Sequence, residues 1–290
     1  MSTLPEIAVA EQADLHRADT STNSTEPAKN PPWTLLAAVA TWFTSVALLF
    51  LPQVMAIPYL AAHYRGTRPT TEILLADKTL ILILVSGVLP AHLITLVIVW
   101  GVATRFGKYS AIKTLGLTWN GKLRLWQSIG LALMLYVAAF LLTLAFGGQG
   151  TALDRLVESS RAAALIIAFL AVATAPLVEE SIYRGILYPA IERTAGAKAA
   201  VILVTLLFAV PHVPQYWPNI GVISSITLLS VVLTLVRART GRLLPCFVVH
   251  LVFNGIQSVI ILFEPYLRAA LETVRHGSTS GSLTSFPFLH

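Results

Sequence analysis

The sequence contains little charge and almost no cysteine. Only 12% of its 290 residues are charged, 56% are hydrophobic, and Cys246 is the single cysteine. One cysteine excludes a disulfide framework within the chain. The mean hydropathy of +0.74 excludes an ordinary soluble domain and is typical of a polytopic membrane protein.

Several catalytic and binding signatures are also missing. The sequence has no GxSxG and no HExxH, which disfavours a serine nucleophile and a single-helix zinc motif. No nucleic-acid-binding motif is present, so we predict no nucleic-acid partner. The inverted repeats that would favour a secondary transporter are not evident either.

Seven apolar segments are long enough, or nearly so, to cross a bilayer as helices of about 20 residues. They cover residues 33–60, 79–103, 125–146, 162–190, 199–213, 220–236 and 243–263. We therefore predict an all-α fold, a polytopic transmembrane helical bundle of about seven spans, with a polar active site buried between the helices.

These segments also suggest how the chain is organised. We expect a disordered polar N-terminal tail (1–32), N-terminal transmembrane helices (33–150), a catalytic transmembrane core (151–263) and a C-terminal tail (264–290). Residues 151–161 have the pattern of a short amphipathic helix at the membrane interface. The bilayer is therefore the first partner that the sequence predicts.

Basic residues gather in the loops on one side of the predicted bundle. These loops hold Arg105, Lys108, Lys113, Lys122, Arg124, Arg193, Lys198, Arg237, Arg239 and Arg242. The positive-inside rule makes this side cytoplasmic. We predict an integral protein of the plasma (inner) membrane with its N-terminus in the cytoplasm and its C-terminus outside. We expect substrate to enter from the cytoplasm or laterally from lipid.

Ionisable and polar residues lie inside four of these apolar segments. Such residues are costly in lipid and usually face the bundle interior. They are His92, Glu179, Glu180, Arg184, His212, His250 and Asn254. Glu179, His212, His250 and Asn254 fall near mid-depth when the rise of ~1.5 Å per helical residue is counted from the predicted span ends. We therefore expect these four to converge.

The spacing of the other polar residues favours structural roles. Glu180 and Arg184 are four residues apart, so one helix face can pair them as a structural ion pair. His92 fits no motif and is expected to be structural.

A carboxylate and an imidazole can together hold a water molecule and take its proton. A second imidazole and an amide can donate hydrogen bonds to a developing oxyanion. This combination indicates peptide hydrolysis by activated water without a covalent nucleophile. A zinc site formed by Glu179, His212 and His250 stays open as an alternative, because ligands can come from separate helices.

Three motifs carry a resemblance to a known family. They are EExxxR (Glu179, Glu180, Arg184), FxxxH (Phe208, His212) and HxxxN (His250, Asn254). This arrangement resembles the CPBP intramembrane proteases, the type II CAAX prenyl endopeptidase and bacteriocin-processing family that includes lysostaphin-resistance-like proteins. The resemblance covers about residues 151–260.

The resemblance implies a role for each matching residue. Glu179 and His212 would activate the water, and His250 and Asn254 would form the oxyanion site. Glu180, Arg184 and Phe208 would support them. The resemblance favours a glutamate mechanism with no cofactor, although the family has also been described as metallopeptidases, which keeps zinc open.

We therefore predict an intramembrane endopeptidase that cleaves a membrane-associated protein or peptide, prenylated CAAX-type or bacteriocin-like. The substrate itself does not carry over from the resemblance. The alternative is a catalytically silent membrane protein that binds a peptide or confers bacteriocin self-immunity.

Overall fold

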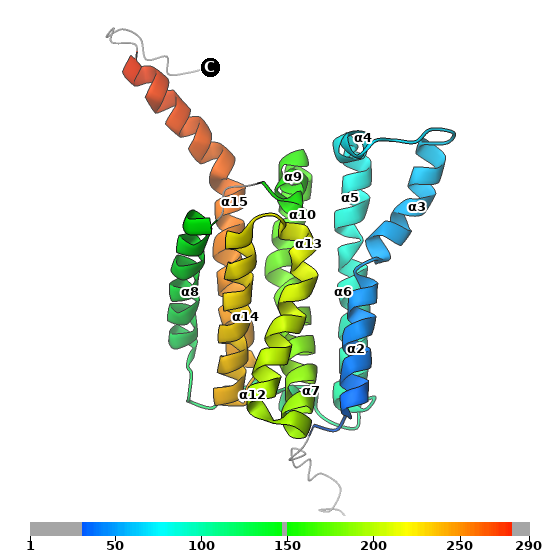
Figure 1. Cartoon of the computed structure of the whole chain (residues 1–290), viewed down its shortest axis with the longest axis vertical. Coiled ribbons are helices and arrows are strands. Elements are labelled where there is room, and N and C mark those ends of the chain that lie inside the picture. Colours follow the sequence, from blue (N-terminus) through cyan, green and yellow to red (C-terminus); the bar gives the residue numbers. More distant parts are fainter. Residues whose placement is uncertain (1–30, 147–149, 280–290) are drawn as a thin grey trace, which may run out of the picture.

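The computed structural model describes residues 31–146 and 150–279, and this part of the chain contains helices and no strands (Figure 1). The predicted all-α bundle is confirmed. Almost all of the predicted N-terminal tail and the last eleven residues of the predicted C-terminal tail lie outside the described residues.

The first half of the bundle consists of helices that are short or broken. They are α2 (Leu35–Leu48), α3 (Leu51–His63), α4 (Thr71–Ala76), α5 (Lys78–Ser86), α6 (Val88–Thr104), α7 (Ala111–Leu115), α8 (Leu125–Phe146) and α9 (Ala152–Ser159). Side-chain caps begin several of them. Asp77, for example, accepts hydrogen bonds from the backbone N–H groups of Thr79 and Leu80 at the start of α5.

The second half contains the predicted catalytic core. Its elements are α10 (Arg161–Phe169), η1 (Leu170–Thr174), α11 (Ala175–Glu180), η2 (Ser181–Leu187), α12 (Tyr188–Ala209), η3 (Val210–His212), α13 (Val213–Tyr216), α14 (Ile220–Thr240) and α15 (Leu244–Thr279). The last helix runs beyond the predicted span end at residue 263, because residues 266–275 are rich in helix-forming Leu, Ala, Arg and Glu.

Six stretches among the described residues are long and apolar enough to cross a membrane. Within the longest, Arg161–Tyr216, α12 consists of two helices that meet at Gly196, whose backbone is not helical (φ 82°, ψ 164°). Figure 1 shows the chain reversing direction at this point within α12. The protein is therefore an integral membrane protein, and the reversal at Gly196 lies between two of the seven predicted segments, 162–190 and 199–213.

The bundle has two ends, which we name by short helices. The α7 face holds α7, the turn at Gly196 and the turn at Gly241 between α14 and α15 (Figure 1). The α9 face holds α4, α9 and α13. All the basic loops identified in the sequence lie on the α7 face.

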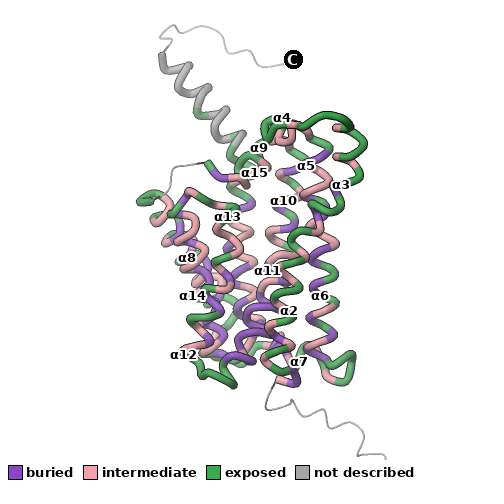
Figure 2. Tube along the Cα trace, turned by 45° about the vertical axis from the view of Figure 1, so that its right-hand side comes forward, coloured by how far each residue is buried: buried purple, intermediate pink, exposed green. Residues whose placement is uncertain are grey.

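The packed core lies closer to the α7 face. Figure 2 shows buried positions concentrated in that half of the bundle. The main cluster includes Val99, Ile186, Leu187, Ala200 and Val204, each at most 2% exposed. A second cluster joins α8 to α14 and α15 through small residues such as Ala132. Small side chains let membrane helices approach closely.

Two π-helical turns flank the short helix that carries the glutamates. η1 ends immediately before α11, whose second residue is Pro176, and η2 follows α11. Proline has no backbone N–H and its ring crowds the carbonyl four residues earlier, so a wider turn accommodates it. The fourth predicted span is therefore widened at Pro176 rather than broken.

One helix contact depends on the absence of a side chain. A Cβ added at Gly87, between α5 and α6, would lie 2.9 Å from the Cα of Pro52 in α3. Gly87→Ala is expected to lower the midpoint of thermal unfolding in detergent, because two backbones would have to separate. Gly130→Ala in α8 is the matched control, since nothing lies within 4 Å of its added Cβ. Its midpoint should stay or rise, because alanine favours helix by about 1 kcal/mol. Equal midpoints for the two variants would contradict this close approach.

Candidate active site

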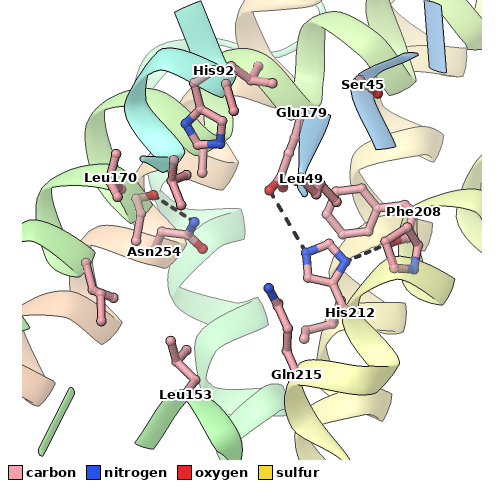
Figure 3. Close-up of a pocket in the computed structure, with 18 of the residues that line it drawn as sticks. Ser45, Leu49, His92, Leu153, Leu170, Glu179, Phe208, His212, Gln215 and Asn254 are labelled. Carbon is pink, nitrogen blue, oxygen red and sulfur yellow. Dashed lines mark hydrogen bonds and ion pairs between the residues drawn. The ribbon is translucent and has the colours of Figure 1, made fainter. Parts of the chain in front are cut away.

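The Glu179 side chain projects into a cavity of about 470 Å³ enclosed by several helices. α11 places it there, and 22% of the side chain remains exposed. Figure 3 shows the carboxylate directed toward His212. Within residues 31–146 and 150–279, no residue donates a direct hydrogen bond to it, in contrast to its neighbour Glu180.

His212 faces the same carboxylate from the end of the next helix. Its Nε2 lies 4.0 Å from Glu179 Oε1, and its Nδ1 lies 2.8 Å from the carbonyl oxygen of Phe208 (Figure 3). A carbonyl can only accept, so Nδ1 donates and the neutral ring presents an unprotonated Nε2. The last carbonyls of a helix have no partner within it, and α12 ends at Ala209. The FxxxH spacing therefore orients the imidazole.

His250 reaches Glu179 from α15. Its Nε2 lies 3.7 Å from Glu179 Oε2, and its Nδ1 lies 2.9 Å from Glu180 Oε1. The side chain is nearly inaccessible. Because a carboxylate holds Nδ1, Nε2 points at the other carboxylate, and both predicted histidines thus meet Glu179.

Glu180 and Arg184 form the predicted ion pair in the bundle interior. Arg184 Nη1 donates to Glu180 Oε1 at 3.0 Å, and Arg184 is 0% exposed. Its other nitrogens donate to Ser230 and Thr234 of α14. The guanidinium carbon lies 4.5 Å from the centre of the Phe208 ring, and that ring stacks on His212 at 4.9 Å. The pair thus supports both histidines.

Asn254 also lines the cavity, but its amide already has one partner. Its Nδ2 donates to the Ala171 carbonyl at 2.9 Å, which leaves the second N–H of the amide for another acceptor (Figure 3). The structure therefore brings Glu179, His212, His250 and Asn254 to one cavity, as the depth count predicted.

Some residues around the site belong to none of the three motifs. His92 lies in the cavity wall and its Nδ1 is 2.7 Å from Thr174 Oγ1, which agrees with the expected structural role. Gln215, one turn beyond His212, also lines the cavity. Ser230 and Thr234 could have been found as two hydroxyl residues four apart in an apolar span.

The site does not form a complete metal-binding set. Within the described residues, no group of three or more His, Cys, Asp and Glu side chains is arranged to hold a metal ion. In tetrahedral zinc sites with bonds of about 2.0–2.1 Å, neighbouring donor atoms are about 3.3 Å apart. The distances of 4.0 Å and 3.7 Å from Glu179 to the histidines are longer. These residues do not fit zinc in this conformation, and we assign no step to a metal.

The cavity does not extend toward the face that the sequence analysis expected. Its wall includes Leu153 and Leu156 of α9 and Tyr216 of α13, but no residue of the basic loops of the α7 face. The packed core of the bundle occupies that direction. Entry from the basic side stays a prediction, as does lateral entry from lipid past α2 and α3, whose Ser45 and Gln53 also line the cavity.

The fold and this cavity define a polytopic helical membrane protein with a carboxylate–imidazole cluster inside the bundle. Residues 161–256 match the family model described as Rce1-like, type II CAAX prenyl endopeptidase Rce1-like. This segment is therefore similar to a domain of that family, and the predicted resemblance to the CPBP family intramembrane proteases is confirmed. The matched segment includes every predicted site residue. No curated protein and no solved structure matches the chain.

Proposed function

We propose that this protein is an endopeptidase in which Glu179 and His212 activate a water molecule to hydrolyse a peptide bond inside the membrane. One observation carries the proposal. The Glu179 carboxylate lies in a cavity within 4.0 Å of the Nε2 atoms of two histidines, and each histidine is fixed through its Nδ1. Gaps of this size are too long for direct hydrogen bonds and suit a bridging water.

The reaction starts with that water. Glu179 removes its proton while His212 Nε2 accepts its second hydrogen bond and directs the oxygen lone pair. The oxygen attacks the carbonyl carbon and forms a tetrahedral intermediate. Glu179 then gives the proton to the amide nitrogen, the C–N bond breaks, and an acid and an amine are released.

The oxyanion of the intermediate needs donors. His250 in its imidazolium form donates through Nε2, and Asn254 donates through its second amide N–H. The charges balance in this state, because Arg184 offsets Glu180, Glu179 is neutral after taking the proton of the water, and the His250 imidazolium offsets the oxyanion. A balanced cluster avoids the cost of an unpaired buried charge.

His212→Ala is expected to lower peptide hydrolysis by about 10²-fold to 10⁴-fold, the usual contribution of an acid–base group. The assay is proteolysis in liposomes against membrane-anchored and farnesylated CAAX peptides, with and without chelator. Phe208→Leu is the comparison, because it removes the ring that stacks on His212 but keeps the carbonyl, and it should retain more activity.

The chelator arm separates the two mechanisms. Activity that is indifferent to chelator supports the glutamate–histidine mechanism. Activity abolished by chelator and restored by zinc would make Glu179, His212 and His250 metal ligands. Peptide binding without cleavage by the wild-type protein would favour the silent binding or immunity role.

We also propose that the protein resides in the plasma (inner) membrane with the α7 face in the cytoplasm. The loops on that face carry ten Lys and Arg residues and one acidic residue, Glu192. The described loops on the α9 face, 64–78, 150–161 and 213–219, carry five basic and four acidic residues. This asymmetry supports the orientation through the positive-inside rule.

A further inference from the structure

The cavity runs from the middle of the bundle toward the α9 face. Its inner end holds Glu179, Tyr183 and Phe208, and its outer wall includes Leu153 of α9 and Gln215 of α13. Figure 3 shows Gln215 and Leu153 on the side of the cavity opposite His92. One route to Glu179 therefore passes α9 and α13, and Ser45 of α2 and Gln53 of α3 line the cavity as well.

The opposite route is closed. Between Glu179 and the α7 face lie residues that are at most 2% exposed, including Ile186, Leu187 and Val204. Arg237 at that end is itself buried and donates to the carbonyls of Leu115 and Gly241, which ties the α7 segment to α14 and α15. A substrate from this side would have to displace the tightest packing in the bundle.

The chemistry of the wall restricts the substrate as well. Among the described residues that line the cavity, none is Lys or Arg, and Glu179 is the only acidic one. Most others are apolar, and the polar ones are neutral amides, hydroxyls or histidines such as Ser45, Gln53 and Gln257. A terminal carboxylate would find no Lys or Arg side chain in the wall and would meet the negative charge of Glu179. The wall suits an uncharged stretch within a chain.

We propose that the substrate enters from the α9 face, that this face is extracytoplasmic, and that the substrate is an apolar, uncharged internal segment. Such segments occur in exported peptides and in the extracytoplasmic stems of membrane proteins. This inference rests on the proposed function for its chemistry, but the direction of entry can be tested without activity. It differs from the trimming of a cytoplasmic CAAX C-terminus, which ends in a carboxylate.

Single cysteine substitutions test the direction of entry in intact cells. Glu158→Cys marks the α9 face, Lys108→Cys marks the α7 face, and Gln215→Cys marks the cavity. All three positions are exposed. The native Cys246 is fully buried, so the wild-type protein measures background labelling. The reagent is a membrane-impermeant maleimide, applied before and after the membrane is opened.

We expect Glu158→Cys and Gln215→Cys to be labelled in intact cells, and Lys108→Cys only after opening. Labelling of Gln215→Cys together with Lys108→Cys, rather than with Glu158→Cys, would overturn the entry route. Labelling of Lys108→Cys alone in intact cells would overturn the orientation. A Gln215→Cys protein that stays unlabelled under both conditions would show the cavity to be closed and would also overturn the inference.

A pair of reporters tests the substrate class. Both carry the same apolar, uncharged segment beside one membrane anchor, placed outside in one reporter and in the cytoplasm in the other. The wild-type protein should cleave only the outer reporter, and introducing a Lys and an Asp into its segment should reduce cleavage at least tenfold. Cleavage of the cytoplasmic reporter alone would overturn this inference while the proposed function stands. Cleavage of neither counts against the proposed function, and the labelling result still decides the entry route.

Discussion

Glu179→Gln is expected to reduce peptide hydrolysis by about 10³-fold or more while the protein keeps its fold and its affinity for peptide. The amide has the shape of the carboxylate but cannot take a proton from water, and loss of a general base costs about 10²-fold to 10⁴-fold. Stability should change little, because Glu179 is partly exposed to the cavity and none of the described residues donates a direct hydrogen bond to it.

Glu192→Gln is the matched control for this variant. It is the same chemical change on an exposed glutamate of α12, where Tyr188 can still donate to the amide oxygen. The measurements are the initial rate of cleavage in liposomes, the Kd for a peptide and the unfolding midpoint in detergent. A Glu179→Gln protein that keeps more than a tenth of the wild-type rate would remove Glu179 from the role of base. Equal losses of rate in both variants would point to a general effect of charge.

The helical bundle and the residues that form the site could be predicted from the sequence. Apolar stretches of sufficient length have almost no alternative to helices in lipid, so Leu125–Phe146 was predicted to the residue. The site could be predicted because ionisable side chains are costly in lipid. Side chains such as Glu179 and His250 therefore gather in the bundle interior, where they can pair with one another.

The direction in which the cavity extends could not be predicted from the sequence in this way. Hydropathy tells how deep Glu179 lies, but which end of the bundle is closed depends on how side chains from separate helices interlock. Ile186, Leu187 and Val204 look like lipid-facing residues in the sequence and are core residues in the structure. The partners of Arg184 were missed similarly, since Ser230 and Thr234 lie 46 and 50 residues away.

Arg184→Met is expected to be among the most destabilising single substitutions in the described part of the chain. It leaves the buried Glu180 carboxylate without its counter-ion, and breaking a buried pair in this way costs about 3–5 kcal/mol. Glu180 Oε2 has no hydrogen-bond partner among the described residues, so Oε1 and its two donors, Arg184 and His250, carry the whole interaction. We expect a strongly lowered unfolding midpoint in detergent.

The double variant Glu180→Gln/Arg184→Met distinguishes an unpaired charge from a simple loss of packing. Removing both charges should recover a large part of the stability lost in Arg184→Met, because the remaining amide oxygen can still accept from His250 Nδ1. Equal stability of the single and double variants would show that the bonds of Arg184 to Ser230 and Thr234 matter more than the ion pair.

Activity should stay low in both variants, because the guanidinium also packs against Phe208, the ring on which His212 stacks. A stable double variant with impaired hydrolysis would thus identify the Glu180–Arg184 pair as positioning residues.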